Sequence, residues 1–223
     1  EQYDFEWIPF EKISKSKALK LYWIIDLHFR GFQPYSEIVE YFDIFLHSTK
    51  SLMQKFEQLT SKQKHIWFPN GVDDRYFTFE YTQKMYDIIF VGSNLPQRQE
   101  AISRLQNTIN LEPFFVTGQD MIDIIRETKI HFNMSISCDV NYRNFETIGL
   151  GTCLLTNYLP EMEELGFINN VNVLFYKSIE DAENQFRKSI KYNTWCDMIP
   201  NILELAKENT YTKRIENLKN EIF

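Results

Sequence analysis

No stretch of the sequence stays apolar for the roughly 20 residues that a membrane-spanning helix needs. The amino terminus also lacks the pattern of a secretory signal peptide. Only three cysteines occur among the 223 residues, and Cys138, Cys153 and Cys196 are widely spaced. Their odd number and spacing argue against a disulfide scaffold and a cysteine-based metal site. We therefore expect reduced packing cysteines and a cytoplasmic protein without an integral membrane segment.

An excess of basic residues is missing too. The chain has 24 Lys and Arg against 31 Asp and Glu, a formal net charge of -7. A whole-surface footprint for nucleic acid is therefore absent, although a local basic cleft stays possible. In contrast, hydrophobic residues make up 43% of the chain and aromatic residues 16%. This composition excludes disorder and, at this length, provides a sizeable core in one large domain or two small ones.

Short apolar runs alternate with stretches of helical character along the chain. Runs of this length without clean polar alternation suit strands covered on both faces, as in a parallel sheet. The alternation predicts an α/β fold with right-handed crossovers. The predicted strands span residues 21–26, 42–47, 65–68, 86–91, 114–116, 130–133, 153–156 and 171–175, and the predicted helices 35–41, 48–59, 97–110, 119–127, 142–150 and 178–191.

A domain boundary is expected near the turn Pro69 to Gly71, because the polar and aromatic stretch from there to Lys84 has no periodicity. Only three predicted strands precede this turn, too few for a complete doubly wound domain, whereas five follow it. The chain starts with glutamate instead of methionine. We therefore expect a fragment of a longer protein whose amino-terminal domain is incomplete.

Ligands of open α/β sheets bind at the carboxyl ends of the strands. Gly92 and Ser93 follow the strand 86–91, and Pro96 then opens a helix. Glycine permits close backbone approach, and free amides at a helix start attract phosphate. Neither the dinucleotide fingerprint nor the P-loop is present. Taken alone, this segment favours a plain strand-to-helix turn over a phosphate loop.

Arg143 and Glu146 are three residues apart in a predicted helix and therefore share a face. One interpretation is an ordinary surface ion pair worth about 0.5 kcal/mol. Two features favour a ligand instead. An arginine in a first helical turn is disfavoured by the helix dipole unless an anion lies nearby, and the next turn contains two glycines that leave room. A carboxylate here could accept the hydroxyls of a ribose, while the guanidinium binds a phosphate.

Asp26 and His28 follow the strand 21–26 two residues apart, so that both can point into one cleft. Such a pair could activate a hydroxyl, or it could cap backbone amides; the sequence leaves both open. His47 precedes Ser48 and Thr49, which we interpret as a helix N-cap. His65 and His131 are expected in the core or at a sheet edge. No histidine has metal-ligand spacing to Cys or carboxylates, so we predict no metal site.

Several segments in order resemble the carboxyl-terminal half of group 1 glycosyltransferases, and most closely their spore-maturation-type branch. These are "YDIIFVGSNLPQRQEAISRL", "NYRNFETIGLG" and "TYTKRIENL". The resemblance runs from about Tyr86 to the end of the chain. "KHIWFPNGVDDRYF" is similar to the interdomain passage of those enzymes, and "LYWIIDLH" to a late strand of their amino-terminal domain.

The resemblance implies a GT-B architecture, in which two Rossmann-like domains bind acceptor and donor. Residues 1–75 would form a partial amino-terminal, acceptor-side domain, and residues 76–208 the nucleotide-sugar-binding domain. Residues 209–223 would form a helix that returns to the first domain. We expect Ile215, Leu218 and Ile222 to pack against residues before Pro69, because their spacing gives the helix a narrow apolar stripe.

Residue by residue, the resemblance assigns the sugar or ribose hydroxyls to Glu146, the diphosphate to Arg143, and the phosphate loop to Gly92 and Ser93. Many retaining members carry two glutamates separated by seven residues. Here the earlier position falls at Asp139, which differs in type and lies one place nearer. We assign Asp139 to donor binding and leave retaining or inverting stereochemistry open.

The predicted function is a metal-independent glycosyltransferase of the hexosyl type. It would move a sugar from a nucleoside diphosphate donor to an unidentified hydroxyl, without a further cofactor. The acceptor could be a polysaccharide, lipid, protein or modified nucleic acid base. Asp26 and His28 would act near that hydroxyl. Two alternatives remain: an inactive nucleotide-sugar-binding module, and a nucleotide-sugar epimerase of the same architecture.

Overall fold

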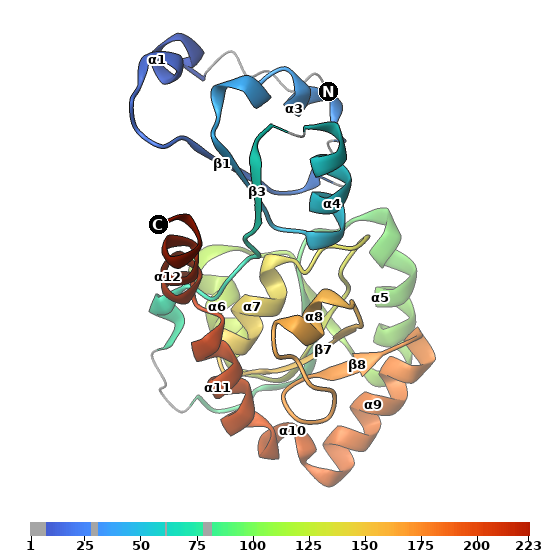
Figure 1. Ribbon diagram of the computed structural model, residues 1–223. Helices are drawn as coiled ribbons and strands as arrows, with labels where there is room; N and C mark the ends of the chain where they lie inside the picture. Colours follow the sequence, from blue (N-terminus) through green and yellow to red (C-terminus); the bar gives the residue numbers. More distant parts are fainter. Residues whose placement is uncertain (1–7, 28–30, 61, 78–81) are drawn as a thin grey trace. The chain divides into compact units, whose positions relative to one another are not determined.

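The computed structural model describes residues 8–27, 31–60, 62–77 and 82–223 (Figure 1). The chain divides into two compact units. The first comprises residues up to Pro69 together with Ser137–Asp139, and the second comprises Asn70–Ile136 and Val140–Phe223. The units divide after Pro69, whereas the sequence places the domain limit at residue 75. The functional domains 1–75, 76–208 and 209–223 stay a prediction.

The described part of the first unit contains a parallel three-stranded sheet in the order β1-β2-β3. Strand β2 is buried along its whole length, because its neighbours cover both edges and an aromatic core packs on the sheet. Tyr35, Phe45 and Phe56 are the large, fully buried rings of that core. The elements are α1 (Phe10–Lys15), β1 (Leu21–Ile24), α3 (Gln33–Ser36), η1 (Val39–Tyr41), β2 (Ile44–His47), α4 (Lys50–Leu59) and β3 (Lys64–Trp67).

The second unit contains a parallel five-stranded sheet in the order β5-β4-β6-β7-β8 among its described residues. Strand β4 pairs with β5 on one side and β6 on the other, so the order reverses between β4 and β6, where ligands of such sheets bind. The elements are η2 (Asp74–Phe77), β4 (Tyr86–Val91), α5 (Pro96–Ile109), β5 (Glu112–Phe114), α6 (Gly118–Arg126), β6 (Thr128–Asn133), α7 (Tyr142–Gly149), β7 (Cys153–Asn157), α8 (Glu161–Glu164), β8 (Leu174–Tyr176), α9 (Ile179–Tyr192), α10 (Thr194–Asp197), α11 (Ile199–Glu208) and α12 (Tyr211–Ile222).

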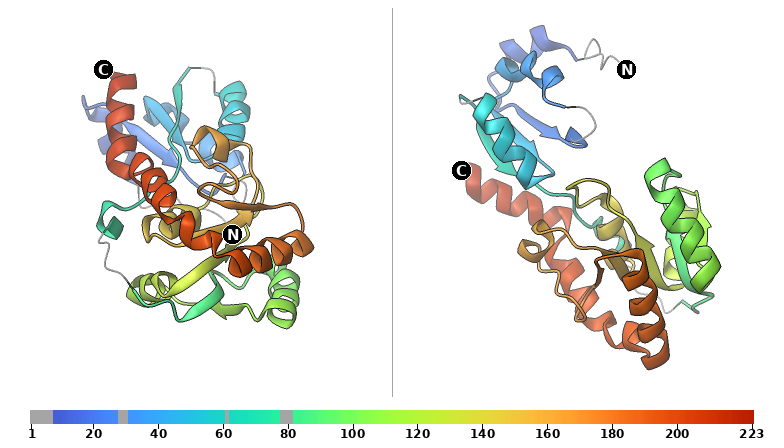
Figure 2. Two further views of the ribbon diagram at one scale, coloured as in Figure 1. Left: turned by 90° about the horizontal axis from the view of Figure 1, so that it is seen from below. Right: turned by 90° about the vertical axis from the view of Figure 1, so that its right-hand side faces the viewer.

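Helices cover both faces of the second sheet (Figure 2). On one face α5 packs beside α9, where Arg104 Nε lies 2.7 Å from Glu183 Oε1. On the other face α7 packs against α11. The predicted α/β fold is therefore confirmed, with a central strand, β6, that is almost entirely buried.

Four local predictions differ from the structure. The predicted helix 35–41 is split between α3 and η1, and the strand predicted at 114–116 lies at Glu112–Phe114. The strand predicted at 171–175 begins only at Leu174, because the left-handed Asn170 and the Asn172 side chain, which accepts from Ile168 N, fold the preceding residues into a turn. Thr49 occupies the N-cap of α4, but its side chain makes no capping bond and donates to Asp139 instead.

The two ends of the second unit meet in a short parallel bridge between Val72 and Thr210. Val72 N donates to Asn209 O at 2.8 Å, and Tyr211 N donates to Val72 O at 3.0 Å. Gly71 is required at this bridge, because a β-carbon there would lie 3.0 Å from Asn209 O. Helix α12 starts at the bridge, and none of its described side chains is buried. The expected return of α12 to the first domain stays a prediction, which an experimental structure resolving the contacts of its apolar stripe would test.

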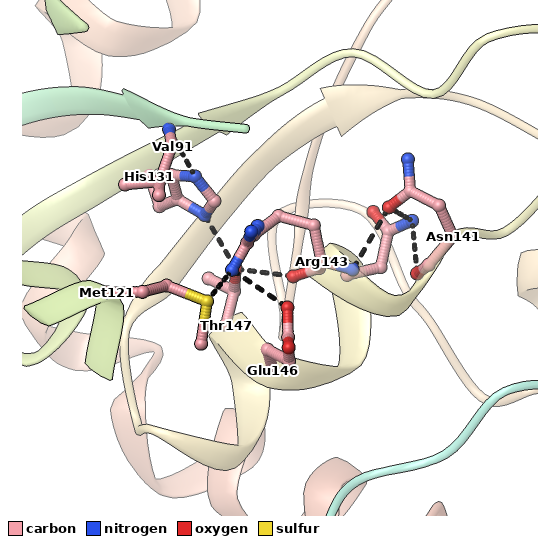
Figure 3. A network of polar contacts seen from close by, with 8 residues as sticks. Val91, Met121, His131, Asn141, Arg143, Glu146 and Thr147 are labelled. Carbon is pink, nitrogen blue, oxygen red and sulfur yellow. Dashed lines mark hydrogen bonds and ion pairs between the residues drawn. The ribbon is translucent and has the colours of Figure 1, made fainter. Parts of the chain in front are cut away.

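His131 joins three elements of the second unit through a directed chain of hydrogen bonds (Figure 3). Val91 N at the end of β4 donates to His131 Nε2 at 3.2 Å, so the ring proton lies on Nδ1. Nδ1 donates to Thr147 Oγ1 at 2.6 Å, and this hydroxyl donates to Arg143 O at 2.6 Å. The ring is fully buried, as expected for a core residue. It therefore fixes α7 against β4 and β6.

We predict that Gly149→Ala destabilises the protein, although alanine is the better helix former by about 1 kcal/mol. A β-carbon at Gly149 would overlap Cγ1 of Val72, which is fully buried in the bridge segment. Overpacking of this kind costs about 1–3 kcal/mol. Urea unfolding measures the effect. A variant as stable as the parent, or more stable, would show that the space exists.

We also predict that stability falls as pH drops below the ordinary histidine pKa. Burial lowers the pKa of His131 well below 6.5, and burial lowers that of His47 to about 3. The unfolded chain then takes up protons that the folded one excludes. The contribution of these two rings to the free energy of unfolding is constant above about pH 6.5 and decreases below it, by up to about 1.4 kcal/mol per pH unit for each ring. Urea unfolding between about pH 7.5 and 5 should give a shallower slope for His131→Asn than for the parent; equal slopes would contradict the assignment.

Candidate functional site

Helix α7 carries Arg143 and Glu146, the pair that the sequence singles out (Figure 3). Asn141 caps the helix, its side chain accepting from Arg143 N at 3.1 Å. Arg143 Nη1 lies 2.8 Å from Glu146 Oε2, and the two side chains are only 16% and 23% exposed. The same nitrogen contacts the sulfur of Met121 on α6. The ion pair between Arg143 and Glu146 is therefore half-buried, and it is not the exposed surface ion pair of the alternative interpretation.

The electrostatics of this pair depend on burial. Burial raises the pKa of Glu146 and lowers that of Arg143, and each charge opposes the shift of the other. Arg143 Nε is buried without a hydrogen-bond partner among the described residues. A buried guanidinium nitrogen without a partner is costly, so an added acceptor at this position would be stabilised.

Arg98 is a candidate that the sequence interpretation missed. It lies in the first turn of α5, where Nε donates to Met134 O at 3.1 Å and Nη1 donates to Ser93 O at 3.3 Å. It thus links the loops after β4 and β6. Burial lowers the pKa of Arg98, and the positive charge of Arg143 lowers it further, so the two guanidinium groups are close enough to repel. No ion pair of the described residues includes Arg98.

Gly92 and Ser93 follow β4 as predicted, next to Arg98. A β-carbon at Gly92 would lie 3.0 Å from the ring of Phe90 and 3.5 Å from Arg98 Nη1. Glycine therefore lets the loop pass close to the guanidinium. Ser93 is exposed. These residues and the two arginines gather at the carboxyl ends of β4 and β6, the place where the strand order reverses.

A network of short polar side chains holds the loop between β6 and α7. Asn133 Nδ2 donates to Asn144 Oδ1 at 3.0 Å and to Thr156 Oγ1 at 3.2 Å. The side chain of Asn157 brackets Ser135, accepting from its N at 2.8 Å and donating to its O at 3.2 Å. Apart from the half-buried Asn157, these residues are buried. Buried, satisfied networks fix a single geometry, so the start of α7 is positioned before any ligand arrives.

Two tyrosines, Tyr76 and Tyr211, lie near Glu146 from separate parts of the second unit. Burial raises the pKa of Tyr76 and of Tyr211, and the nearby Glu146 charge raises both further. Tyr211 also interacts with the backbone of Gly71 and with the hydroxyl of Tyr142. The first turn of α12 therefore contributes to the surroundings of Glu146, which the sequence did not predict.

The remaining predicted residues belong to the first unit. Asp139 is buried and accepts a hydrogen bond from Thr49 Oγ1 at 3.1 Å. Asp26 follows β1 with a left-handed backbone, φ 56°, and a half-buried side chain. Strained backbone of this kind often accompanies functional residues. His28 lies outside the described residues. The roles of all three stay predictions.

In the described part of the chain, no group of three or more His, Cys, Asp or Glu side chains could hold a metal ion. The expected metal independence stays a prediction. Within the same described ranges, no helix has the length and apolar character needed to cross a membrane.

Similar solved structures share the fold at low sequence identity. The pneumococcal O-GlcNAc transferase GtfA, in complex with UDP and GlcNAc, has a TM-score of 0.59 and 12% identity; the match covers 86% of this chain and 47% of that one. HepE from Anabaena, in complex with UDP-glucose, has a TM-score of 0.65 and 12% identity, over 90% of this chain and 72% of that one. Sucrose-phosphate synthase from Thermosynechococcus elongatus has a TM-score of 0.65 and 10% identity, over 97% and 71%.

This chain spans about half the length of GtfA. None of the curated proteins matches the chain in sequence. The family model described as glycosyl transferase-like matches residues 85–220, which is more than half of the chain. The chain therefore belongs to the glycosyl transferase-like family and has the GT-B type of α/β fold.

Proposed function

We propose that this protein transfers a sugar from a nucleoside diphosphate donor to a hydroxyl acceptor. The observation that supports this most directly is the proximity of Arg98 and Arg143, two half-buried cations of which only Arg143 has a carboxylate partner, Glu146. Together the three groups carry a formal charge of +1. An excess of buried positive charge at a switch point suits a bound diphosphate.

Each group has a distinct role in this proposal. Arg98 and Arg143 bind the diphosphate and stabilise it as it leaves, while Gly92 and Ser93 form the loop that approaches it. Glu146 accepts the hydroxyls of the ribose or sugar. The UDP and UDP-glucose complexes of GtfA and HepE support a UDP-sugar as the sugar donor.

The acceptor side of the proposal rests on the first unit. Asp26 or His28 acts as the base near the acceptor hydroxyl, and Asp139 assists donor binding. The proposal also includes the predicted domain limits and the terminal helix that returns to the first domain. It further includes the spore-maturation-type branch, the cytoplasmic location and the metal independence. The acceptor, the stereochemistry and the identity of the sugar stay open within it.

A nucleotide screen followed by a turnover assay tests the function. Ligands that bind the folded state raise the melting temperature by mass action, so UDP and UDP-glucose should raise it and uridine should not. Slow release of UDP from UDP-glucose would then indicate a working site, whereas binding without release would indicate the inactive module. NMR of the nucleotide-sugar would reveal an epimerase, because the sugar would change configuration while still attached. No melting-temperature shift with any nucleoside diphosphate would refute the proposal.

We predict that Arg98→Ala weakens UDP binding at least about tenfold, because a charged hydrogen bond to phosphate contributes roughly 1.5–3 kcal/mol. The matched control is Arg104→Ala on the same helix, whose exposed guanidinium pairs with Glu183. Calorimetric titration of both variants measures the difference. Equal affinities for UDP would remove Arg98 from the site.

We predict that Glu146→Gln weakens UDP-glucose binding by about 1–3 kcal/mol, because the amide keeps the shape but loses a charged acceptor. The control is Glu204→Gln, since Glu204 is an exposed partner of Lys207 on α11. Urea unfolding of the same preparations separates loss of affinity from loss of stability. Unchanged calorimetric affinity would end the assignment of Glu146.

We predict that His28→Ala slows sugar transfer about 100-fold or more and leaves donor binding intact, which is the usual effect of losing a general base. The rate and the melting temperature are measured on one preparation. A lower melting temperature with a transfer rate within about twofold of the parent would show that His28 stabilises the fold instead.

A further inference from the structure

A cavity lies at the carboxyl ends of β7 and β8, whereas Arg98 and Arg143 lie beyond the carboxyl ends of β4 and β6. It has a volume of about 880 Å³ and lies between the residues after β7, the segment 163–169 and the first turns of α9. Small-molecule sites have volumes in this range and combine an apolar wall with a few placed polar groups. The cavity belongs wholly to the second unit.

Its apolar wall is aromatic and unusually accessible. Tyr158 packs edge-on against Phe175, with ring centroids 5.3 Å apart and an interplanar angle of 84°. Tyr158 is 42% exposed and Ile168 is 56% exposed, and both line the cavity. A hydrogen bond from Tyr158 Oη to Glu163 Oε1, 2.9 Å long, fixes the ring. The wall therefore offers a rigid apolar surface at little cost in side-chain entropy.

The charges around the cavity argue against a nucleotide or another anion. Glu163 and Asp181 contribute two carboxylates, and Lys177 contributes one ammonium group. Two backbone amides at the start of α9 are already paired, because Asp181 Oδ2 accepts from Lys177 N at 2.9 Å and Ser178 Oγ accepts from Asp181 N at 3.1 Å. The lining has a formal charge of -1, which favours a neutral ligand.

Two carboxamides supply unused hydrogen-bonding groups. Asn169 Oδ1 accepts from Phe175 N at 3.0 Å, which leaves its amide nitrogen without a partner in the described part of the chain. Gln185 likewise has no hydrogen-bond partner among the described residues, at either end of its amide. Donors and acceptors thus stand beside an exposed aromatic ring.

We infer that this cavity binds a neutral saccharide. A pyranose ring presents an apolar face of C–H bonds, which stacks on an aromatic ring, and a rim of hydroxyl groups, which bond to carboxamides and carboxylates. Tyr158 is the platform, and Gln185 and Asn169 bind the rim. The inference rests on the proposed function in one respect only, the identification of the saccharide as part of the acceptor. This part of the acceptor would then be bound by the unit that is proposed to bind the donor.

NMR titration of the full chain tests the inference with three neutral probes: maltotriose, triacetylchitotriose and lactose. At least one should shift the amide resonances of Ile168 and Lys177 saturably, with a dissociation constant on the order of 1 mM. Tyr158→Ala and, separately, Gln185→Ala should weaken that binding about fivefold or more, the effect of losing one stacked ring or one set of hydrogen bonds. Tyr192→Ala is the control, because Tyr192 is an exposed tyrosine of α9 outside the cavity.

The inference is overturned if none of the probes shifts these resonances, or if Tyr158→Ala binds as tightly as the parent. A response to the diamine putrescine without a response to the saccharides would overturn it in favour of a cationic ligand. UDP is titrated in parallel and should shift the amides of Gly92 and Ser93 instead. A response to UDP without a response to the saccharides would refute the saccharide site and leave the proposed function intact. A response to the saccharides without a response to UDP would refute the proposed function.

Discussion

The buried imidazole of His131 holds β4, β6 and α7 of the second unit together. Its two nitrogens have opposite roles, one accepting from Val91 and the other donating to Thr147. Only a neutral ring in a single tautomer can do this. The bond from Thr147 to Arg143 O then extends the chain into the first turn of α7. The His131 side chain thus fixes the position of helix α7, which carries Arg143, relative to the end of β4.

Two guanidinium groups, of Arg98 and Arg143, lie close together in this part of the second unit. A guanidinium in the first turn of a helix is opposed by the helix dipole, and Arg98 and Arg143 are both in that position, on α5 and α7. Glu146 compensates one of them. Buried amide and hydroxyl groups hold the loop between β6 and α7 in place, which fixes the backbone from which Arg143 extends. A diphosphate would relieve a repulsion that the fold itself maintains.

The sequence predicted what depends on local pattern. The apolar runs that became β4, β6 and β7 are buried on both faces, which is why their positions were found to within two residues. The strand predicted at 114–116 was placed too late, because β5 contains Pro113. An edge strand such as β5 tolerates proline, but proline does not belong to the apolar pattern from which strands are predicted. Arg98 was overlooked, although the dipole argument applied to Arg143 holds for it equally. Tyr211 could not be found, because it lies far along the chain from Glu146 and only the bridge to Val72 brings it near.

That bridge also governs the order in which the second unit can form during synthesis. Val72 leaves the ribosome long before Asn209 and Tyr211, its backbone partners, have been made. Until then Val72 has no strand partner, and the contact of Gly149 with its side chain has nothing to hold it in place. The sheet and its helices can assemble progressively as the chain emerges, but Tyr76 and Tyr211 both lie near Glu146 only after α12 has begun to emerge. The surroundings of Glu146 are therefore completed later than the sheet that carries them.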